Sequence, residues 1–232
     1  MFDSIRKALS LGIPPEETHH PATLDEVARW AQSRQAVLES DGVPGGYALS
    51  GQAGAVVWRL ECGSPTRSYI TGLELRGGAD ARARQDAAVL VLGRALQEHL
   101  ESEFFAVPAS PLTQDAQAQL PQEVRWLAEL DEVAWDGLPP SFVRHFAVLA
   151  ADVDVARRWL QPALVSRLLD GLPVTSGAEE AGALPAPEPR VLMLSRGTVY
   201  LRMPHPTQAL QPLAHAVDLL TAAARCAAKE LP

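Results

Sequence analysis

Hydrophobic and polar positions alternate on both sides of a turn sequence in residues 55–77. The turn, at residues 63–66, contains the Gly, Ser and Pro that commonly reverse a chain, and β-branched and aromatic residues flank it. A hairpin closed by this turn pairs Leu60 with Tyr69 and has one apolar face. We expect that face to point into the core, and it carries Trp58, Leu60, Tyr69 and Leu73.

Residues 81–104 give the longest helical pattern in the chain, with Asp80 as a possible N-cap. Residues 87–92 are apolar almost all round, which is typical of a buried helix. We expect this helix to pack against the apolar face of the hairpin. Gly77-Gly78 is expected to end the strand that precedes it.

Helix and strand signals continue on both sides of these elements. Thr23 and Glu26 have the spacing of a capping box, which predicts a helix that runs to about residue 40. Further along, residues 133–136 are expected to form a strand, and residues 142–149 a region that ends as one. Helices are expected to begin near Asp152 or Asp154 and near Pro162.

The C-terminal part of the chain predicts a second hairpin and a last helix. Two strand-like runs flank Arg196-Gly197 within residues 190–203. Residues 207–231 then repeat apolar residues at helical spacing.

These elements predict an α+β fold, with an antiparallel β-sheet built from hairpins at about 54–77 and 190–203 and helices packed on one face. We expect a single domain over residues 1–232. The alternative is a division into sub-domains at 1–105 and 122–232. Residues 172–189 are rich in Pro, Gly, Ala and Glu, and are expected to form a mobile loop.

Composition narrows the possible functions. The chain has 232 residues and a formal net charge of −8, which disfavours nucleic acid as a partner. We expect no signal peptide and no transmembrane helix, and therefore no membrane partner. Cys62 and Cys226 lie far apart, and we expect buried thiols of a cytoplasmic protein rather than a disulfide.

Residues 135–169 contain an F-x3-F-A-V strand pattern followed by an A-R-x2-L-x-P helix pattern. The residues that carry it are Trp135, Pro140, Phe142, Phe146, Ala147, Val148, Asp154, Ala156, Arg157, Leu160 and Pro162. This segment, together with the later hairpin, resembles uncharacterised bacterial proteins of domain-of-unknown-function families. The resemblance covers roughly the last 100 residues. It implies a fold and a bacterial source, and it carries no activity or catalytic residue.

Recognisable catalytic and cofactor motifs are missing from the sequence. It contains no HExxH, GxSxG, P-loop or GxGxxG, and its histidines do not have the spacing of a metal site. We therefore predict no metal and no cofactor. The densest polar set on regular structure is expected to be solvated surface, with a partner-binding face as the alternative. Its members are Arg59, Glu61, Arg67, Glu74 and Arg76.

Two functions remain open. The first is a non-catalytic cytoplasmic module that binds a protein partner or a second copy of itself. The second is a small-molecule-binding protein or an enzyme with an unfamiliar site. That site would need a pocket where side chains from separate elements meet, and the candidates are Arg59, Tyr69, His145 and His205.

Overall fold

The structure, a computed structural model, describes residues 21–40, 42, 45–105, 120–170, 172 and 190–232. The loop predicted at 172–189 therefore lies outside the described residues, apart from Leu172.

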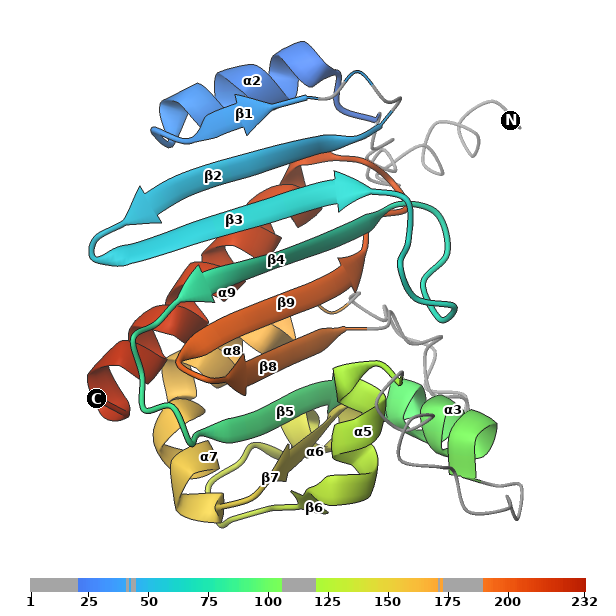
Figure 1. The fold of residues 1–232 in the computed structure, drawn as a ribbon, viewed down its shortest axis with the longest axis vertical. Helices are drawn as coiled ribbons and strands as arrows, with labels where there is room; N and C mark the ends of the chain where they lie inside the picture. Colours follow the sequence, from blue (N-terminus) through green and yellow to red (C-terminus); the bar gives the residue numbers. More distant parts are fainter. Residues whose placement is uncertain (1–20, 41, 43–44, 106–119, 171, 173–189) are drawn as a thin grey trace, which may run out of the picture.

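The described strands form one antiparallel sheet, in the order β1-β2-β3-β4-β9-β8-β5-β7-β6 (Figure 1). Strands from the two parts of the chain, 21–105 and 120–232, are interleaved in this sheet. β4 of the first part pairs with β9 of the second, and β5 of the first part pairs with both β7 and β8 of the second. The strands are β1 (Val37–Glu39), β2 (Tyr47–Ala53), β3 (Val56–Gly63), β4 (Glu74–Asp80), β5 (Ala88–Gly93), β6 (Asp131–Glu132), β7 (Phe146–Ala150), β8 (Val191–Ser195) and β9 (Thr198–Pro204).

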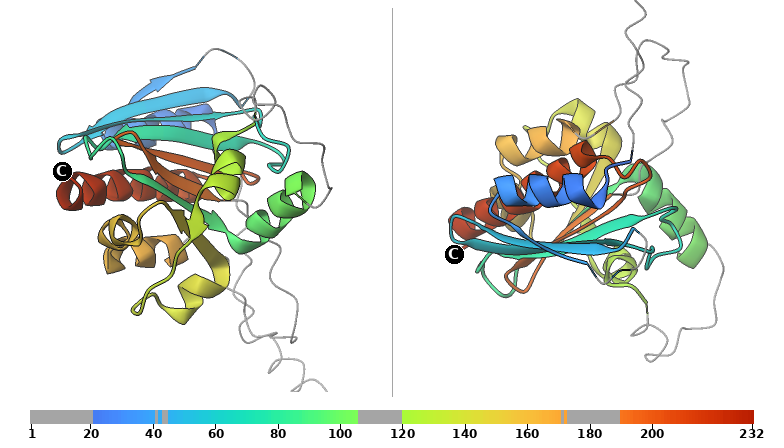
Figure 2. Two further views of the ribbon diagram at one scale, coloured as in Figure 1. Left: turned by 60° about the horizontal axis from the view of Figure 1, so that its bottom comes forward. Right: turned by 90° about the horizontal axis from the view of Figure 1, so that it is seen from above.

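Helices lie on both sides of this sheet, and the fold is α+β as expected. They are α2 (Leu24–Ser33), α3 (Arg94–Phe105), α5 (Gln122–Glu129), α6 (Pro140–His145), α7 (Val153–Trp159), α8 (Pro162–Asp170) and α9 (Leu210–Glu230). The helices α2, α7, α8 and α9 cover the back of the sheet as seen in Figure 1, where they enclose the larger core (Figure 2). The helices are not confined to one face, however, because α3 and α5 enclose a second cluster with the opposite faces of β5, β7 and β8. We call this second side, which faces the viewer in Figure 1, the front face.

The hairpin predicted at 55–77 has a different partner strand. β3 pairs with β2 and with β4, so Leu60 lies opposite Leu49 and Gly77, and residues 64–73 form the connection between β3 and β4. Trp58 and Leu60 do enter the larger core, and Leu73 packs against it. Tyr69 packs against the cluster on the front face instead, so the prediction that these four side chains share one face is wrong.

The reason for this error is Gly77-Gly78, which continues β4 rather than ending it. A Cβ atom at Gly77 would lie 2.3 Å from the backbone oxygen of Arg59. Glycine at this position is therefore required because the backbone of β3 packs so closely. A glycine inside a strand can mark such a close approach and need not end the strand.

The helix predicted at 81–104 is also wrong in its first half. Residues 88–93 form β5, in the interior of the sheet between β8 and β7, and the helix α3 begins only at Arg94. Val89 and Val91 face the larger core, whereas Leu90 and Leu92 face the front cluster. The run is apolar throughout because a strand covered on both faces needs apolar side chains on both.

Most local predictions in the remaining chain are confirmed. The second hairpin is β8 and β9 with a turn at Arg196-Gly197, and α9 follows it. Thr23 forms the capping box of α2, but this helix ends at Ser33 rather than near residue 40, and residues 37–39 form β1. Asp152 caps α7. Residues 142–149 do end as a strand, but they begin in α6. The strand expected at 133–136 is not formed, and the short strand β6 lies just before that segment, at 131–132.

Candidate functional site

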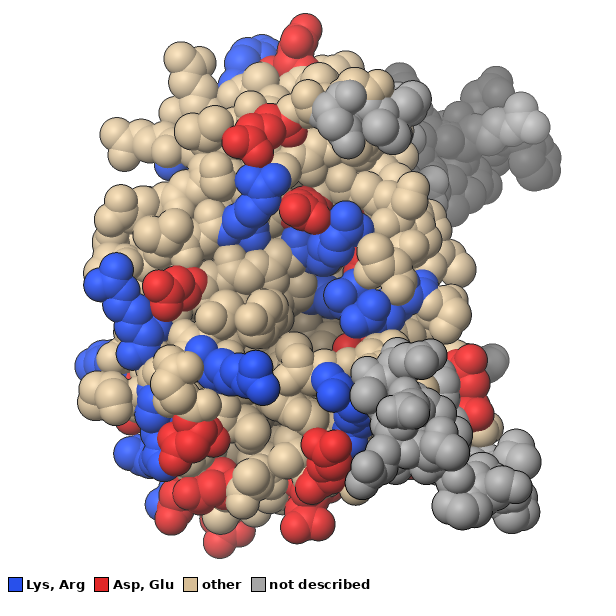
Figure 3. Space-filling view, viewed as in Figure 1, with Lys and Arg blue, Asp and Glu red and all other residues tan. Residues whose placement is uncertain are grey.

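A groove of about 440 Å³ lies on the front face, at the border between its covered and uncovered halves. The helices α3 and α5 cover β5, β7 and β8, while β3, β4 and β9 have no helix in front of them (Figure 1). Figure 3 shows a hollow near the middle of this face, with basic side chains around it. The described lining residues are Arg59, Glu61, Arg67, Arg76, Gly77, Gly78, Gln122, Glu123, Val191, Met193, Tyr200, Leu201 and Arg202.

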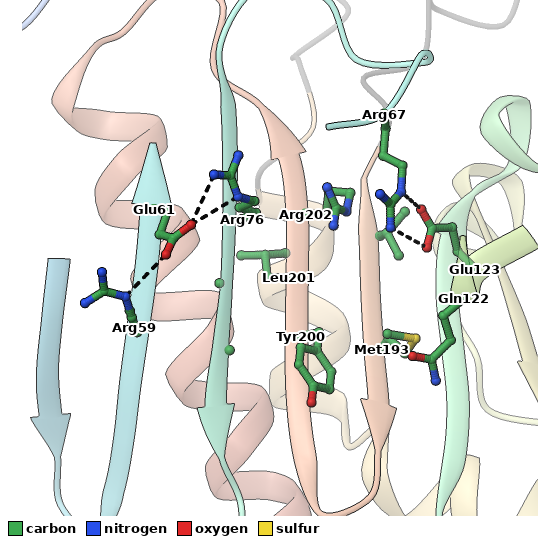
Figure 4. Close-up of a pocket in the computed structure, with 13 residues that line it drawn as sticks. Arg59, Glu61, Arg67, Arg76, Gln122, Glu123, Met193, Tyr200, Leu201 and Arg202 are labelled. Carbon is green, nitrogen blue, oxygen red and sulfur yellow. Dashed lines mark hydrogen bonds and ion pairs between the residues drawn. The ribbon is translucent and has the colours of Figure 1, made fainter. Parts of the chain in front are cut away.

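Arginines from neighbouring strands meet at this groove. Arg76 on β4 lies directly opposite Arg202 on β9, and both side chains are on the front face. Arg67, from the connection after β3, lies on the other side of Arg202 (Figure 4). Two like charges directly opposite each other on adjacent strands destabilise a sheet, so this arrangement requires nearby negative charge.

Glu74, two residues before Arg76 on β4, supplies part of that charge. Its side chain is 0% exposed and accepts a hydrogen bond from the guanidinium of Arg202, and its Oε2 lies 3.7 Å from Nη1 of Arg76. The backbone N–H and the hydroxyl of Thr66 donate to the same carboxylate, at 2.7 and 3.1 Å. A buried carboxylate needs such partners, because an unpaired charge away from water is very costly.

Glu123, on α5, is the second buried carboxylate. Arg67 donates to both of its oxygens, and the hydroxyl of Tyr69 donates to Oε1 at 2.7 Å. Burial alone would raise the pKa of Glu123, but the hydrogen bonds from Arg67, the backbone and Tyr69 hold that pKa below its usual value. The pKa of Tyr69 is raised by burial and by the negative charge of Glu123. Both groups therefore keep their charge state at neutral pH.

Arg202 is held by one nitrogen and leaves one edge of its guanidinium free. Its Nη1 donates to Glu74 and to the hydroxyl of Thr66, at 2.6 Å for the second bond. Neither Nε nor Nη2 donates to any residue that the structure describes. The side chain is only 19% exposed and lines the groove, and the bonds of Nη1 fix its position. The Nε–Nη2 edge can give two parallel hydrogen bonds to a carboxylate or phosphate.

The outer side of the groove is more open to water. Arg59 pairs with Glu39 and Glu61, at 2.8 and 3.3 Å, and about half of its side chain is exposed. Arg76 pairs with Glu61 at 3.1 Å. Exposed pairs of this kind contribute little to stability and exchange easily with other ions.

Of the four candidate residues, Arg59 lines this groove. Tyr69 is not among its lining residues, but its hydroxyl donates to Glu123, which is. His145 ends α6 and its Nδ1 lies 2.8 Å from the carbonyl oxygen of Ser141. His205 is buried beyond the end of β9 and lines a separate cavity with Tyr47 and Cys62. Burial lowers the pKa of His205 to about 4.

Sequence reasoning missed the residues that give the groove its character. Arg67, Glu74 and Arg76 belong to the polar set recognised in the sequence, but Glu74 is fully buried rather than on a solvated surface. Arg202 and Glu123 come from distant segments, and only the pairing of β4 with β9 and the docking of α5 place them here. No local motif marks either residue.

Other site types find little support within the described part of the chain. No three His, Cys, Asp or Glu side chains there are grouped as a metal site would require. None of the groove residues named above is His, Cys, Lys or Ser. In the same part of the chain, every helix is too short or too polar to cross a membrane.

Comparison with known proteins adds no family to this picture. The resemblance to uncharacterised bacterial families stays a prediction, and the case for function rests on the groove alone. No protein-family model, no curated protein and no solved structure matches this chain.

Proposed function

We propose that this protein is a non-catalytic binding protein whose groove takes a small ligand with a carboxylate or phosphate group. The observation that carries the proposal is that Arg202 lines the groove while its Nε and Nη2 have no partner among the described residues. Because Glu74 and Thr66 hold Nη1, little side-chain freedom is lost when an anion binds to the other edge.

The distribution of charged side chains around the groove supports an anionic ligand. Four arginines and two glutamates are among the described lining residues, so their formal charge is +2 in a chain whose net charge is −8. The carboxylates of Glu74 and Glu123 are paired with guanidiniums of this set and are only 0% and 3% exposed. A ligand entering the groove therefore meets mainly N–H donors, in a concave site that concentrates the local field.

The size and chemistry of the groove favour a small ligand that is bound rather than converted. A volume of about 440 Å³ falls within the range of roughly 300–1,000 Å³ typical of small-molecule sites. Its glutamates are paired with arginines. A carboxylate stabilised in its charged form is a weak general base at neutral pH.

The proposal also includes a protein partner or a second copy of the chain, and a location in the bacterial cytoplasm. Cys62 and Cys226 are both free thiols, which fits a reducing compartment.

Calorimetric titration with inorganic phosphate and with succinate tests the proposal. We expect both anions to bind the unmodified protein at low ionic strength, and Arg202→Gln to weaken binding by about tenfold or more, since a hydrogen bond to a charged group contributes about 1.5–3 kcal/mol. The matched control is Arg82→Gln, which removes the same charge from a loop position where the side chain is 75% exposed. Equal weakening by the two variants, or no binding of either anion, would contradict the proposal.

A further inference from the structure

We infer that the ligand carries a planar aromatic ring beside its anionic group, as a nucleoside monophosphate does. This inference rests on the proposed function and adds a second contact to it. The residue that makes this contact is Tyr200, which lines the groove two positions before Arg202 on β9.

The spacing of these two side chains suits one small molecule. Residues two apart on a strand point to the same face and are about 7 Å apart along it. Figure 4 shows Arg202 and Tyr200 one above the other along the front of β9. A ligand whose phosphate sits on the free edge of Arg202 therefore places a ring, one short linker away, over Tyr200.

Tyr200 is unusually accessible for an aromatic side chain in a groove. It is 42% exposed, and its hydroxyl makes no hydrogen bond with the described residues. On one side its strand neighbour is Met193, and on the other it is Gly78. The ring is thus available for stacking, and Met193 supplies an apolar wall next to it.

Gly78 keeps the space beside this ring open. A Cβ atom there would lie 3.6 Å from the ring of Tyr200 and 3.7 Å from Thr198, which are ordinary contact distances. Packing would therefore accept a side chain at Gly78, unlike at Gly77, where the backbone of β3 is too close. A strand glycine that packing does not require is typical of a place that a ligand approaches closely.

Phosphate is the anion that fits the surroundings of Arg202 best. Arg76 and Arg67 stand on either side of it, and their side chains are 30% and 23% exposed. A phosphate monoester brings up to two negative charges and three terminal oxygens, so it interacts with this row of positive charge more strongly than one carboxylate does.

The test compares two ligands that differ only in the ring, ribose 5-phosphate and adenosine 5′-monophosphate. We expect the nucleotide to bind the unmodified protein about tenfold more tightly, because stacking of one base on an aromatic side chain is worth roughly 5- to 150-fold in affinity. Tyr200→Ala should remove this difference and leave ribose 5-phosphate binding unchanged. Tyr200→Phe is the matched control and should preserve the difference, and Arg202→Gln should weaken both ligands by the same factor.

The outcomes of this test distinguish the aromatic contact of Tyr200 from anion binding by the groove. Equal affinities of the unmodified protein for the two ligands would overturn the aromatic contact and leave anion binding intact. A preference for the nucleotide that survives in Tyr200→Ala would overturn the role of Tyr200. Binding of neither ligand would overturn the proposed function as well. If Tyr200→Ala fails to fold, the comparison of the two ligands on the unmodified protein still decides the outcome.

Discussion

The two halves of the front face are built on one continuous sheet and differ only in what covers them. Under α3 and α5, β5 presents Leu90 and Leu92, both fully buried. A few strands away, β4 and β9 present Arg76, Arg202 and the half-exposed Tyr200. The covered half therefore behaves as core and the uncovered half as a binding surface. The two buried carboxylates, Glu74 and Glu123, lie near the border between them.

This arrangement places stability and recognition in different residues. Substitutions in the covered half should change the free energy of unfolding. Substitutions in the uncovered half should change ligand affinity and leave stability nearly constant. The border carboxylates should affect both, because they are buried and also position the arginines.

The largest expected change in the free energy of unfolding is in the covered half. Leu90→Ala should destabilise the protein by about 4 kcal/mol, because it leaves a cavity in a close-packed cluster. The control is Val57→Ala on the front of β3, a side chain 54% exposed, which should cost about 0.5 kcal/mol or less. Urea unfolding measures both. Similar costs at the two positions would remove the distinction between the halves.

The next effect is at the border. Glu74→Gln should cost about 3 kcal/mol, since it leaves Arg202 and Arg76 facing each other without the carboxylate that pairs with both. The double variant Glu74→Gln/Arg202→Gln should recover part of that loss, because it also removes one of the like charges. A double variant as unstable as the sum of the two single variants would show that the two side chains are not coupled.

A smaller effect is expected on the stability of the fold at low pH. The folded-state pKa of Glu123 is lowered below its ordinary value of 4.5, so its contribution to stability is fully present above pH 4.5 and is lost as the pH falls through the folded pKa. One such group changes stability by at most about 1.4 kcal/mol per pH unit. Glu123→Gln should therefore flatten the loss of stability below pH 4.5, measured by urea unfolding at a series of pH values. An unchanged slope would mean that Glu123 does not titrate with folding.

The smallest effect is at the exposed edge of the groove. Arg59→Gln should change stability by about 0.5 kcal/mol or less, since its pairs with Glu39 and Glu61 are solvent-exposed. It should weaken phosphate binding less than Arg202→Gln does, because Arg59 is not fixed by a buried partner. Thermal unfolding and calorimetry check the two statements. A larger affinity loss for Arg59→Gln than for Arg202→Gln would move the anion site toward β3.

The sequence could predict those elements of the fold that are formed by residues adjacent in the chain. The hairpin around Arg196-Gly197 was predictable because its turn and strands are adjacent in the chain. The run that became β5 was ambiguous, because an apolar segment covered on both faces has the same pattern in a strand as in a buried helix. Gly77-Gly78 was misread because a glycine that ends a strand and one that permits close packing look the same in sequence.

The site was less predictable than the fold for a physical reason. Arg76 and Arg202 meet because β4 pairs with β9, and Arg67 meets Glu123 because α5 docks on the front face. Both contacts join residues far apart in the chain, so no spacing rule reports them. The dense polar set on β3, β4 and their connection was visible in the sequence, but whether it faced water or a groove depended on those two contacts.

The most direct test of the anion site observes the Nε–H group of Arg202 itself. In a nitrogen-15-labelled sample titrated with inorganic phosphate, arginine Nε–H resonances report which guanidinium binds the anion, and the Arg202→Gln variant assigns the signal. The account predicts that the Arg202 resonance shifts most, while that of the exposed Arg82 stays nearly constant. A resonance of Arg202 that does not move, while other arginines do, would contradict it.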